Sequence, residues 1–257
     1  MRNTSYALLV AMVVGCSGDL GLTQRPALYA RLAPNLQYSI VKDTASLGGT
    51  RSISNSINNL GDIAGFSNLA GNRMRHAALW QNGLLTDLGT LGGPNSSVAW
   101  AGQNESGTIV GFSQTVDADT LGESWSCAAF FPAATGTGRI CLGFVWENGS
   151  LTAMPTLGGE NSYATGVNDH GRVVGWAETR VHDPTCNAPQ VLQFRAVVWE
   201  PRSGSMRQLR PLPGDSASAA TAINEGGQVV GISGDCDVAV GQFSARHAVL
   251  WERDTMI

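Results

Sequence analysis

The sequence predicts an all-β protein, a β-propeller-like array of four blades that each contain four antiparallel strands. Three observations predict this fold. A short motif rich in Asn and Gly occurs four times, and an aliphatic-Trp pair follows each copy. Three of the four units then end on a polar strand and a turn of the Leu-Gly-Gly type. A unit of this length repeated in one chain indicates stacked or circularly arranged sheets.

Each unit reads as four strands joined by turns and insertions. In the third unit, residues 162–167 and 172–176 predict the first hairpin, because the Asn-Asp-His-Gly sequence between them has the residues of a tight turn. After an insertion, residues 195–200 and 205–209 predict the third and fourth strands. The 32 glycines and the low charged fraction of 14% also favour a turn-rich β domain over a helical bundle.

The turn Asn and the paired Trp recur once per unit, and we interpret both as structural. A turn needs its Asn in every blade, whereas a catalytic residue would appear once. The Trp residues are expected to pack between blades, although an exposed indole ring would suit stacking on a sugar. These residues are Asn58, Asn104, Asn168 and Asn224 in the turns and Trp80, Trp146, Trp199 and Trp251 in the pairs.

The predicted blade boundaries leave one strand missing. Blades one to three span about residues 50–91, 95–157 and 161–212, and the fourth stops after its third strand at Trp251. Residues 38–43, followed by a Leu-Gly-Gly turn, match a fourth strand. This N-terminal strand is therefore a candidate to complete the last blade and close the ring, which would remove two exposed sheet edges. The alternative is that the chain is a truncated piece of a larger propeller.

The N-terminus predicts export. Residues 1–16 have a short basic start, an apolar stretch and a processing site, and the apolar stretch is too short to span a bilayer. We interpret them as a signal peptide with a lipobox-like end, in which Cys16 is lipidated. The alternative is ordinary secretory cleavage nearby, with loss of Cys16. Residues 17–37 are then a linker and residues 38–257 the repeat domain, held in the cell envelope by a lipid anchor or released outside the cell.

Four further cysteines remain in a chain sent to an oxidising compartment, so disulfide bonds are expected. Four cysteines allow three connectivities. Cys127 and Cys141 lie in one insertion, and Cys186 and Cys236 lie in matching insertions of consecutive repeats, so these two pairs are favoured. Their spacing does not fit zinc, which needs two close pairs of Cys or His.

Two segments carry a family resemblance: Arg-His-Ala-Ala-Leu-Trp-Gln-Asn-Gly at 75–83 and Thr-Asp-Leu-Gly-Thr-Leu-Gly-Gly-Pro-Asn-Ser at 86–96. Over residues 38–252 the chain resembles the bacterial extracellular HAF-repeat family, named for a His-Ala-Phe tripeptide ahead of a Leu-Trp pair. Only His76 and His247 keep the histidine, and other residues replace the aromatic one. The resemblance implies an exported, propeller-like repeat protein without a defined biochemical activity, and it transfers no catalytic residue.

Unequal insertions distinguish the blades and are expected at one rim of the ring, where repeat arrays tend to carry binding surfaces. They hold carboxylates beside aromatic and basic side chains, which suits a glycan, a peptide or calcium. The candidate ligand-binding residues are Asp117, Asp119, Glu123, Trp125, Phe131, Arg180, His182, Asp183, Asp235 and Asp237. Calcium takes six or more oxygens, and the segment after Asp119 lacks the usual bidentate Glu. A solvated loop is therefore favoured there, and no metal or other cofactor is expected.

From these patterns we expect an exported, monomeric repeat scaffold that binds a glycan or a protein through its rim. The alternative is a polysaccharide hydrolase or lyase with rim carboxylates as acid and base. No local feature identifies such a pair, so an enzyme is not favoured. P-loop, dinucleotide-binding and serine-hydrolase motifs are absent. A formal net charge of -4 without a basic stripe argues against nucleic acid, and only a lipid anchor would bring the domain to a membrane.

Overall fold

The computed structural model describes residues 45–123, 125–236, 245–252 and 255–256. The predicted signal peptide, Cys16, the linker and the strand at 38–43 lie outside the described residues. The described chain is almost entirely β-structure, with one short helix, α1 (Trp125–Ala128). The all-β prediction is confirmed.

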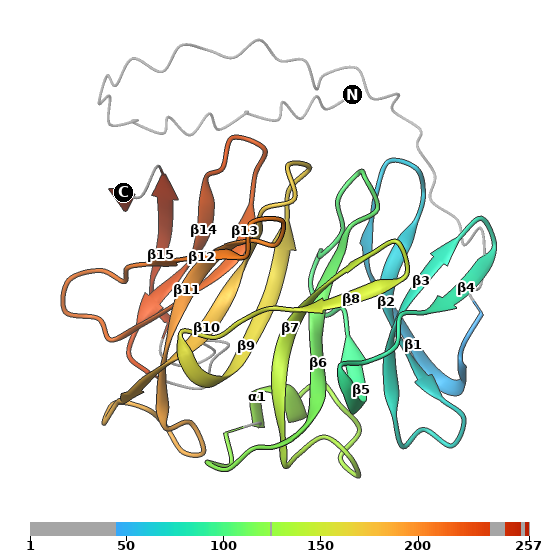
Figure 1. Ribbon diagram of the computed structural model, residues 1–257, viewed down its shortest axis with the longest axis horizontal. Helices are drawn as coiled ribbons and strands as arrows, with labels where there is room; N and C mark the ends of the chain where they lie inside the picture. The colour runs from blue at the N-terminus through green and yellow to red at the C-terminus, as the bar shows by residue number, and fades with distance from the viewer. Residues whose placement is uncertain (1–44, 124, 237–244, 253–254, 257) are drawn as a thin grey trace, which may run out of the picture. The chain divides into compact units, whose positions relative to one another are not determined.

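Four antiparallel meanders follow one another along the chain, each with strands in sequence order (Figure 1). Repeat 1 comprises β1 (Gly48–Ile57), β2 (Ile63–Leu69), β3 (Arg75–Gln81) and β4 (Leu84–Asp87); repeat 2 comprises β5 (Gly92–Ser97), β6 (Ile109–Ala118), β7 (Arg139–Glu147) and β8 (Ser150–Ala153); repeat 3 comprises β9 (Gly158–Val167), β10 (Val173–His182), β11 (Leu192–Glu200) and β12 (Ser205–Leu209); repeat 4 comprises β13 (Ala217–Ile223), β14 (Val229–Gly234), β15 (Ala245–Glu252) and β16 (Thr255–Met256). A single parallel pair, Arg75 with Asn95, joins the sheets of repeats 1 and 2.

The last sheet differs from the expectation for its fourth strand. The chain continues past Trp251, and β16 pairs with β15 through Trp251–Met256 and Glu252–Thr255. The edge that residues 38–43 were expected to take is therefore occupied, in the described residues, by Thr255 and Met256. The fourth strand pairs with a strand only three residues before it, so its pairing carries no cost of long-range loop closure.

The motif ends on Gly because the first and second strands of each repeat approach very closely. A Cβ atom on Gly175 would lie 1.8 Å from the carbonyl oxygen of Tyr163. The equivalent glycines, Gly65, Gly111 and Gly231, would each place a Cβ within 2.0 to 2.3 Å of a carbonyl oxygen. No side chain fits at these distances, so the motif requires Gly there.

The turn Asn of each repeat holds its own turn and, in the middle repeats, reaches the next one. Asn168 Oδ1 accepts from the Arg172 backbone N–H at 3.0 Å, and Asn168 Nδ2 donates to the Asn224 carbonyl at 3.1 Å. Asn104 makes the same two bonds, to Thr108 and to Asn168. These bonds support the structural interpretation of the turn Asn, because both ends of the carboxamide serve the backbone.

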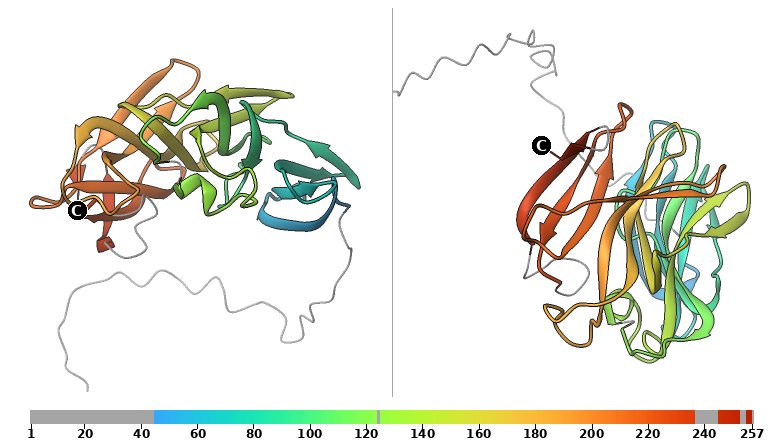
Figure 2. Two further views of the ribbon diagram at one scale, coloured as in Figure 1. Left: turned by 90° about the horizontal axis from the view of Figure 1, so that it is seen from below. Right: turned by 60° about the vertical axis from the view of Figure 1, so that its left-hand side comes forward.

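Consecutive repeats pack face to face, in chain order (Figure 2). We call the face that packs on the following repeat the forward face and the face that packs on the preceding repeat the backward face. At the junction of repeats 3 and 4, the forward face contributes Val174, Ala196 and Val198, and the backward face contributes Val229, Val249 and Trp251. Two similar apolar clusters join repeats 1 and 2 and repeats 2 and 3. The core is therefore a series of layers between sheets.

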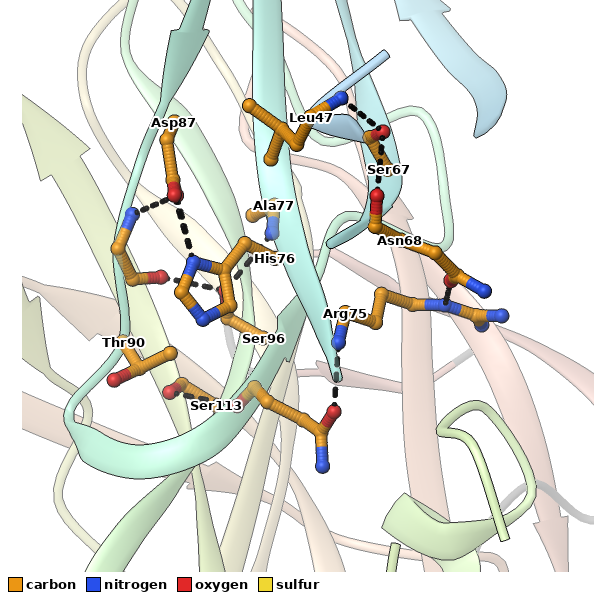
Figure 3. A network of polar contacts seen from close by, with 12 residues as sticks. Leu47, Ser67, Asn68, Arg75, His76, Ala77, Asp87, Thr90, Ser96 and Ser113 are labelled. Carbon is orange, nitrogen blue, oxygen red and sulfur yellow. Dashed lines mark hydrogen bonds and ion pairs between the residues drawn. The ribbon is translucent and has the colours of Figure 1, made fainter. Parts of the chain in front are cut away.

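At each junction, one serine side chain of the later repeat forms hydrogen bonds with the backbone of the earlier repeat. Ser96 Oγ accepts from the Ala77 N–H at 2.8 Å across the junction of repeats 1 and 2 (Figure 3). Ser162 and Ser218 do the same for Gly143 and Ala196 at the next two junctions. Each serine hydroxyl also donates to a carbonyl of the preceding repeat. Each of these serine hydroxyls, which we call a serine staple, therefore bonds one backbone N–H and one backbone carbonyl of the preceding repeat, near the end of its short fourth strand.

Both predicted disulfide bonds are present. Cys127 pairs with Cys141 inside the insertion of repeat 2, and Cys186 pairs with Cys236 between the insertions of repeats 3 and 4. Two disulfide bonds indicate an oxidising, exported environment. In the described part of the chain, no helix is long and apolar enough to cross a membrane.

Candidate functional site

The insertions between the second and third strands lie together at one end of the sheets, as their contacts show. Thr135 in the insertion of repeat 2 donates its hydroxyl to the Arg73 carbonyl of repeat 1 at 2.6 Å. Glu123 reaches the insertion of repeat 3, and the Cys186–Cys236 disulfide continues the series to repeat 4. We call this end the insertion end and the opposite end, which carries the Asn turns, the turn end.

Glu123 is part of the interior of the insertion end. Its Oε1 accepts from the backbone N–H groups of Val191 and Leu192 and, at 3.2 Å, from Gln190 Nε2. Gln190 Nε2 also donates to Glu178 Oε1 at 2.9 Å. We call Glu123, Gln190 and Glu178 the carboxyl clasp. It fastens the insertion of repeat 2 to that of repeat 3.

Both carboxyl groups of the clasp have raised pKa values. Burial, reinforced by the neighbouring carboxyl of Glu123, raises the pKa of Glu178 to about 8. Burial also raises the pKa of Glu123, although the backbone N–H groups of Leu192 and Val191 oppose that rise. Glu123 Oε2 and Gln190 Oε1 are buried and have no hydrogen-bond partner in the described residues. Two buried carboxylates beside each other favour retention of a proton at neutral pH.

Other predicted rim residues also serve the fold. Asp183 is buried and accepts from the Thr185 backbone and hydroxyl at 2.9 and 2.7 Å, which shapes its loop. Phe131 packs in the aromatic core with Phe112. Asp119 Oδ1 accepts from the backbone of Leu121 and Gly122. These three side chains therefore make contacts within their own chain.

The remaining predicted rim residues are spread over the insertion end. Asp117, Arg180 and His182 are exposed, and Asp235 forms an ion pair with Arg246. Asp237 and the Trp125 side chain lie outside the described residues. Among the residues that the structure describes, no three His, Cys, Asp or Glu are grouped to hold a metal ion.

A pocket of about 390 Å³ opens at the turn end, between repeats 1 and 2. Its lining is mainly polar: Asp62, Gln81, Gln103, Thr108, Glu147 and Arg202 contribute, together with the indole of Trp146. Gln81 Nε2 donates to Asp62 Oδ2 at 2.8 Å, and Thr108 Oγ1 donates to Glu147 Oε1 at 2.9 Å. Both carboxylates are thus held in place before any ligand arrives.

Gln103 is the unusual residue of this pocket. Its Oε1 and Nε2 atoms are buried, and neither has a hydrogen-bond partner among the described residues. The residue before the turn Asn is Ile57, Val167 or Ile223 in the other repeats, so a carboxamide stands here where the pattern has an aliphatic side chain. Buried polar atoms without a partner are rare, because each costs about 1–3 kcal/mol. Gln103 lines the pocket, so a rotation of its side chain would bring the carboxamide to a ligand or water there.

Trp146 is the second irregularity. It is partly exposed, whereas the equivalent Trp80, Trp199 and Trp251 are buried. The sheet opposite carries Ala64 where repeats 2 and 3 carry a valine, and Leu79 where they carry Val145 and Val198. Leu79 and Trp146 both line the pocket.

The two histidines that match the HAF-repeat pattern each lie within hydrogen-bond distance of an aspartate. His76 Nδ1 lies 2.8 Å from Asp87 Oδ2, and His247 Nδ1 lies 3.1 Å from Asp215 Oδ2. The hydroxyl group of Ser96, drawn beside His76 in Figure 3, donates a hydrogen bond to the Gly89 carbonyl. Asp87 ends the fourth strand of repeat 1, whereas Asp215 precedes the first strand of repeat 4, so the two contacts differ in their place within the repeat.

No family model, curated protein or solved structure matches this chain. The resemblance to the HAF-repeat family therefore stays a prediction.

Sequence reasoning missed Gln103, Gln190 and Glu178 as site residues. Gln103 had a visible signal, since aligning the four motifs shows one polar residue among aliphatic ones. The carboxyl clasp had no signal in the sequence, because Glu123 and Gln190 are 67 residues apart.

Proposed function

We propose that this protein is an exported repeat scaffold that binds a glycan in the turn-end pocket between repeats 1 and 2. Its four meanders act as the blades of a propeller-like array, and export follows from the predicted signal peptide and the oxidised cysteines. The observation that carries the proposal is the unpartnered carboxamide of Gln103 beside the partly exposed ring of Trp146.

The chemistry of the lining fits a saccharide. A sugar ring offers apolar C–H groups on its faces and hydroxyl groups on its edge. An indole ring matches the faces, and planar amides and carboxylates match the hydroxyls, since each donates or accepts two bonds in a plane. Gln81, Gln103 and Glu147 supply these planar groups. The volume of about 390 Å³ lies within the range of roughly 300–1,000 Å³ that is usual for ligand pockets.

The turn end is a better binding site than the insertion end. At the insertion end, Glu123, Phe131 and Asp183 are buried and contact their own chain. The insertions then act mainly to fasten repeats together through the carboxyl clasp and the Cys186–Cys236 disulfide. The exposed Asp117, Arg180 and His182 remain available for a second partner.

The hydrolase or lyase alternative has less support. A pair of acid and base carboxyls must reach the substrate, and of the predicted rim carboxylates Glu123 and Asp183 are buried. Release of new reducing ends in the binding experiment would favour that alternative over binding alone.

Isothermal titration calorimetry with cellohexaose, xylohexaose, chitohexaose and maltohexaose tests the proposal. We expect one of them to bind and to change tryptophan fluorescence. The Gln103→Val variant restores the aliphatic residue of the other repeats, so it should fold at least as well and bind at least tenfold more weakly. Arg210→Ala, an exposed change outside the pocket lining, is the matched control and should bind normally. Absence of binding to all four sugars, or unchanged affinity in Gln103→Val, would overturn the proposal.

A further inference from the structure

Nothing in the described part of the chain covers the forward face of repeat 4. Val230 is 44% exposed, whereas the equivalent Ala64, Val110 and Val174 are 0%, 1% and 0% exposed. All four residues stand directly before the close-approach Gly of their motif. The same position is therefore buried in each repeat that packs on a following described repeat, and exposed in repeat 4.

The rest of that face shows the same difference. Ala248 is exposed and Leu250 is partly exposed, while Ala196 and Val198 at the equivalent places in repeat 3 are buried. In repeat 3 these residues are covered by the backward face of repeat 4. The forward face of repeat 4 carries small and aliphatic residues, like the forward face of repeat 3. Its composition is therefore that of a face that packs on another repeat.

The hydrogen bonds that accompany apolar packing at a junction are also missing at the forward face of repeat 4, among the described residues. Across the junction of repeats 3 and 4, the Ala196 N–H donates to Ser218 and the Asp169 N–H donates to the Glu225 carboxylate at 3.0 Å. The equivalent donors in repeat 4 are the backbone N–H groups of Ala248 and Glu225. Among the described residues, no serine or acid of a following repeat stands opposite them.

Repeat 1 carries the complementary half. Its backward face exposes Ile57 at 68% and part of Ile63, whereas Val173 and Val229, the equivalents of Ile63, are buried. Ser52 stands at the staple position and donates to Ser67 of its own repeat at 2.9 Å. One chain therefore holds both halves of a repeat junction, unpaired, in its first and fourth repeats.

We propose that the partner of this face is a second copy of the same chain, with repeat 4 of each copy packed on repeat 1 of the other. Two such contacts related by a two-fold axis form a closed pair, the commonest symmetry of soluble homo-oligomers. The pair is a ring of eight sheets, which lies within the four-to-eight range of propellers. Val230 and Leu250 of one copy cover Ile63 of the other, and Ser52 accepts from the Ala248 N–H. This departs from the monomer that the sequence predicted, because exposure of Val230 appears only in the folded chain.

Sedimentation velocity on the full chain at micromolar concentration tests the pairing. We expect a species of about twice the chain mass of 26.9 kDa. Val230→Asp and Ile57→Asp each place a charge in both contacts and should weaken pairing at least tenfold. Val116→Asp, at another exposed valine on the insertion of repeat 2, is the control and should leave the mass unchanged.

Mixing the two variants decides the geometry. A Val230→Asp chain keeps an intact repeat 1 and an Ile57→Asp chain keeps an intact repeat 4, so the mixture should pair through the one unmodified contact when neither variant pairs alone. Recovery on mixing also shows that both variants fold. A monomeric wild-type chain, or a pair that neither variant weakens, would overturn the proposal. A monomer with Val230 protected from solvent would instead indicate closure within one chain.

Discussion

Glu123 and Glu178 share one donor: Gln190 Nε2 lies 3.2 Å from Glu123 Oε1 and 2.9 Å from Glu178 Oε1. The two carboxyls come from different repeats, and both are buried. The insertions of repeats 3 and 4 are joined by a disulfide bond, whereas the clasp joins those of repeats 2 and 3 without one. Of these two connections between insertions, the carboxyl clasp is therefore the one whose strength depends on protonation of its carboxyl groups.

We expect stability to fall as the pH rises through the window of the clasp. The pKa of Glu178 is raised from 4.5 to about 8 in the folded protein, so between these values the folded chain binds a proton that the unfolded chain has lost. Stability from this group is complete below pH 4.5 and is lost as the pH approaches about 8, at up to about 1.4 kcal/mol per pH unit. Urea denaturation at pH 5 and at pH 8.5 measures the difference.

Glu178→Gln isolates that contribution, because the amide cannot titrate. The variant should show a smaller loss of unfolding free energy between the two pH values than the wild type. Glu200→Gln, at an exposed acid that pairs with Arg172, should keep the wild-type profile. Equal pH dependence in wild type and Glu178→Gln would rule out the clasp as its source.

The two disulfide bonds should differ in their effect on stability. Cys186–Cys236 closes 50 residues and Cys127–Cys141 closes 14. Constraint of the unfolded chain grows with loop length, which gives about 4 kcal/mol for the first and about 3 kcal/mol for the second. Paired Cys→Ser variants compared by urea denaturation should follow that order. A larger loss from the shorter loop would contradict this account.

Ser162→Ala should cost about 1–3 kcal/mol, because it leaves the buried Gly143 N–H without an acceptor. Ser52→Ala is the matched control from the same repeat position. Ser52 meets only Ser67 of its own repeat in the described chain, so its loss should be smaller. Thermal unfolding of the two variants measures the contrast, and equal losses would show that the serine staples do not hold the repeats together. The control is informative at concentrations where the chain is monomeric, since pairing would engage Ser52.

Much of the fold could be read from the sequence because its determinants are local and repeated. The Asn turns, the close-approach Gly and the aliphatic-Trp strands recur, so four units with the same strand order were predictable before any contact was known. The two disulfide pairings followed from the placement of one pair of cysteines in a single insertion and of the other pair in matching insertions. The fourth strand of repeat 4 was missed, since a pairing of two residues, Thr255 and Met256, leaves too little pattern to read.

The candidate sites were decided by the tertiary structure. Sequence placed Glu123, Phe131 and Asp183 on a binding rim as polar or aromatic residues of an insertion, but burial depends on what a loop folds against. Glu123 is buried because backbone donors 68 and 69 residues away converge on it. Gln103 was visible as an exception to the repeat, yet only the folded junction shows that its carboxamide is buried without a partner in a pocket that Trp146 also lines. The sequence by itself determined the units and their turns, since neighbouring residues dictate these. The tertiary structure decided which polar groups are buried and which faces stay uncovered, because both depend on residues that approach only after the repeats pack.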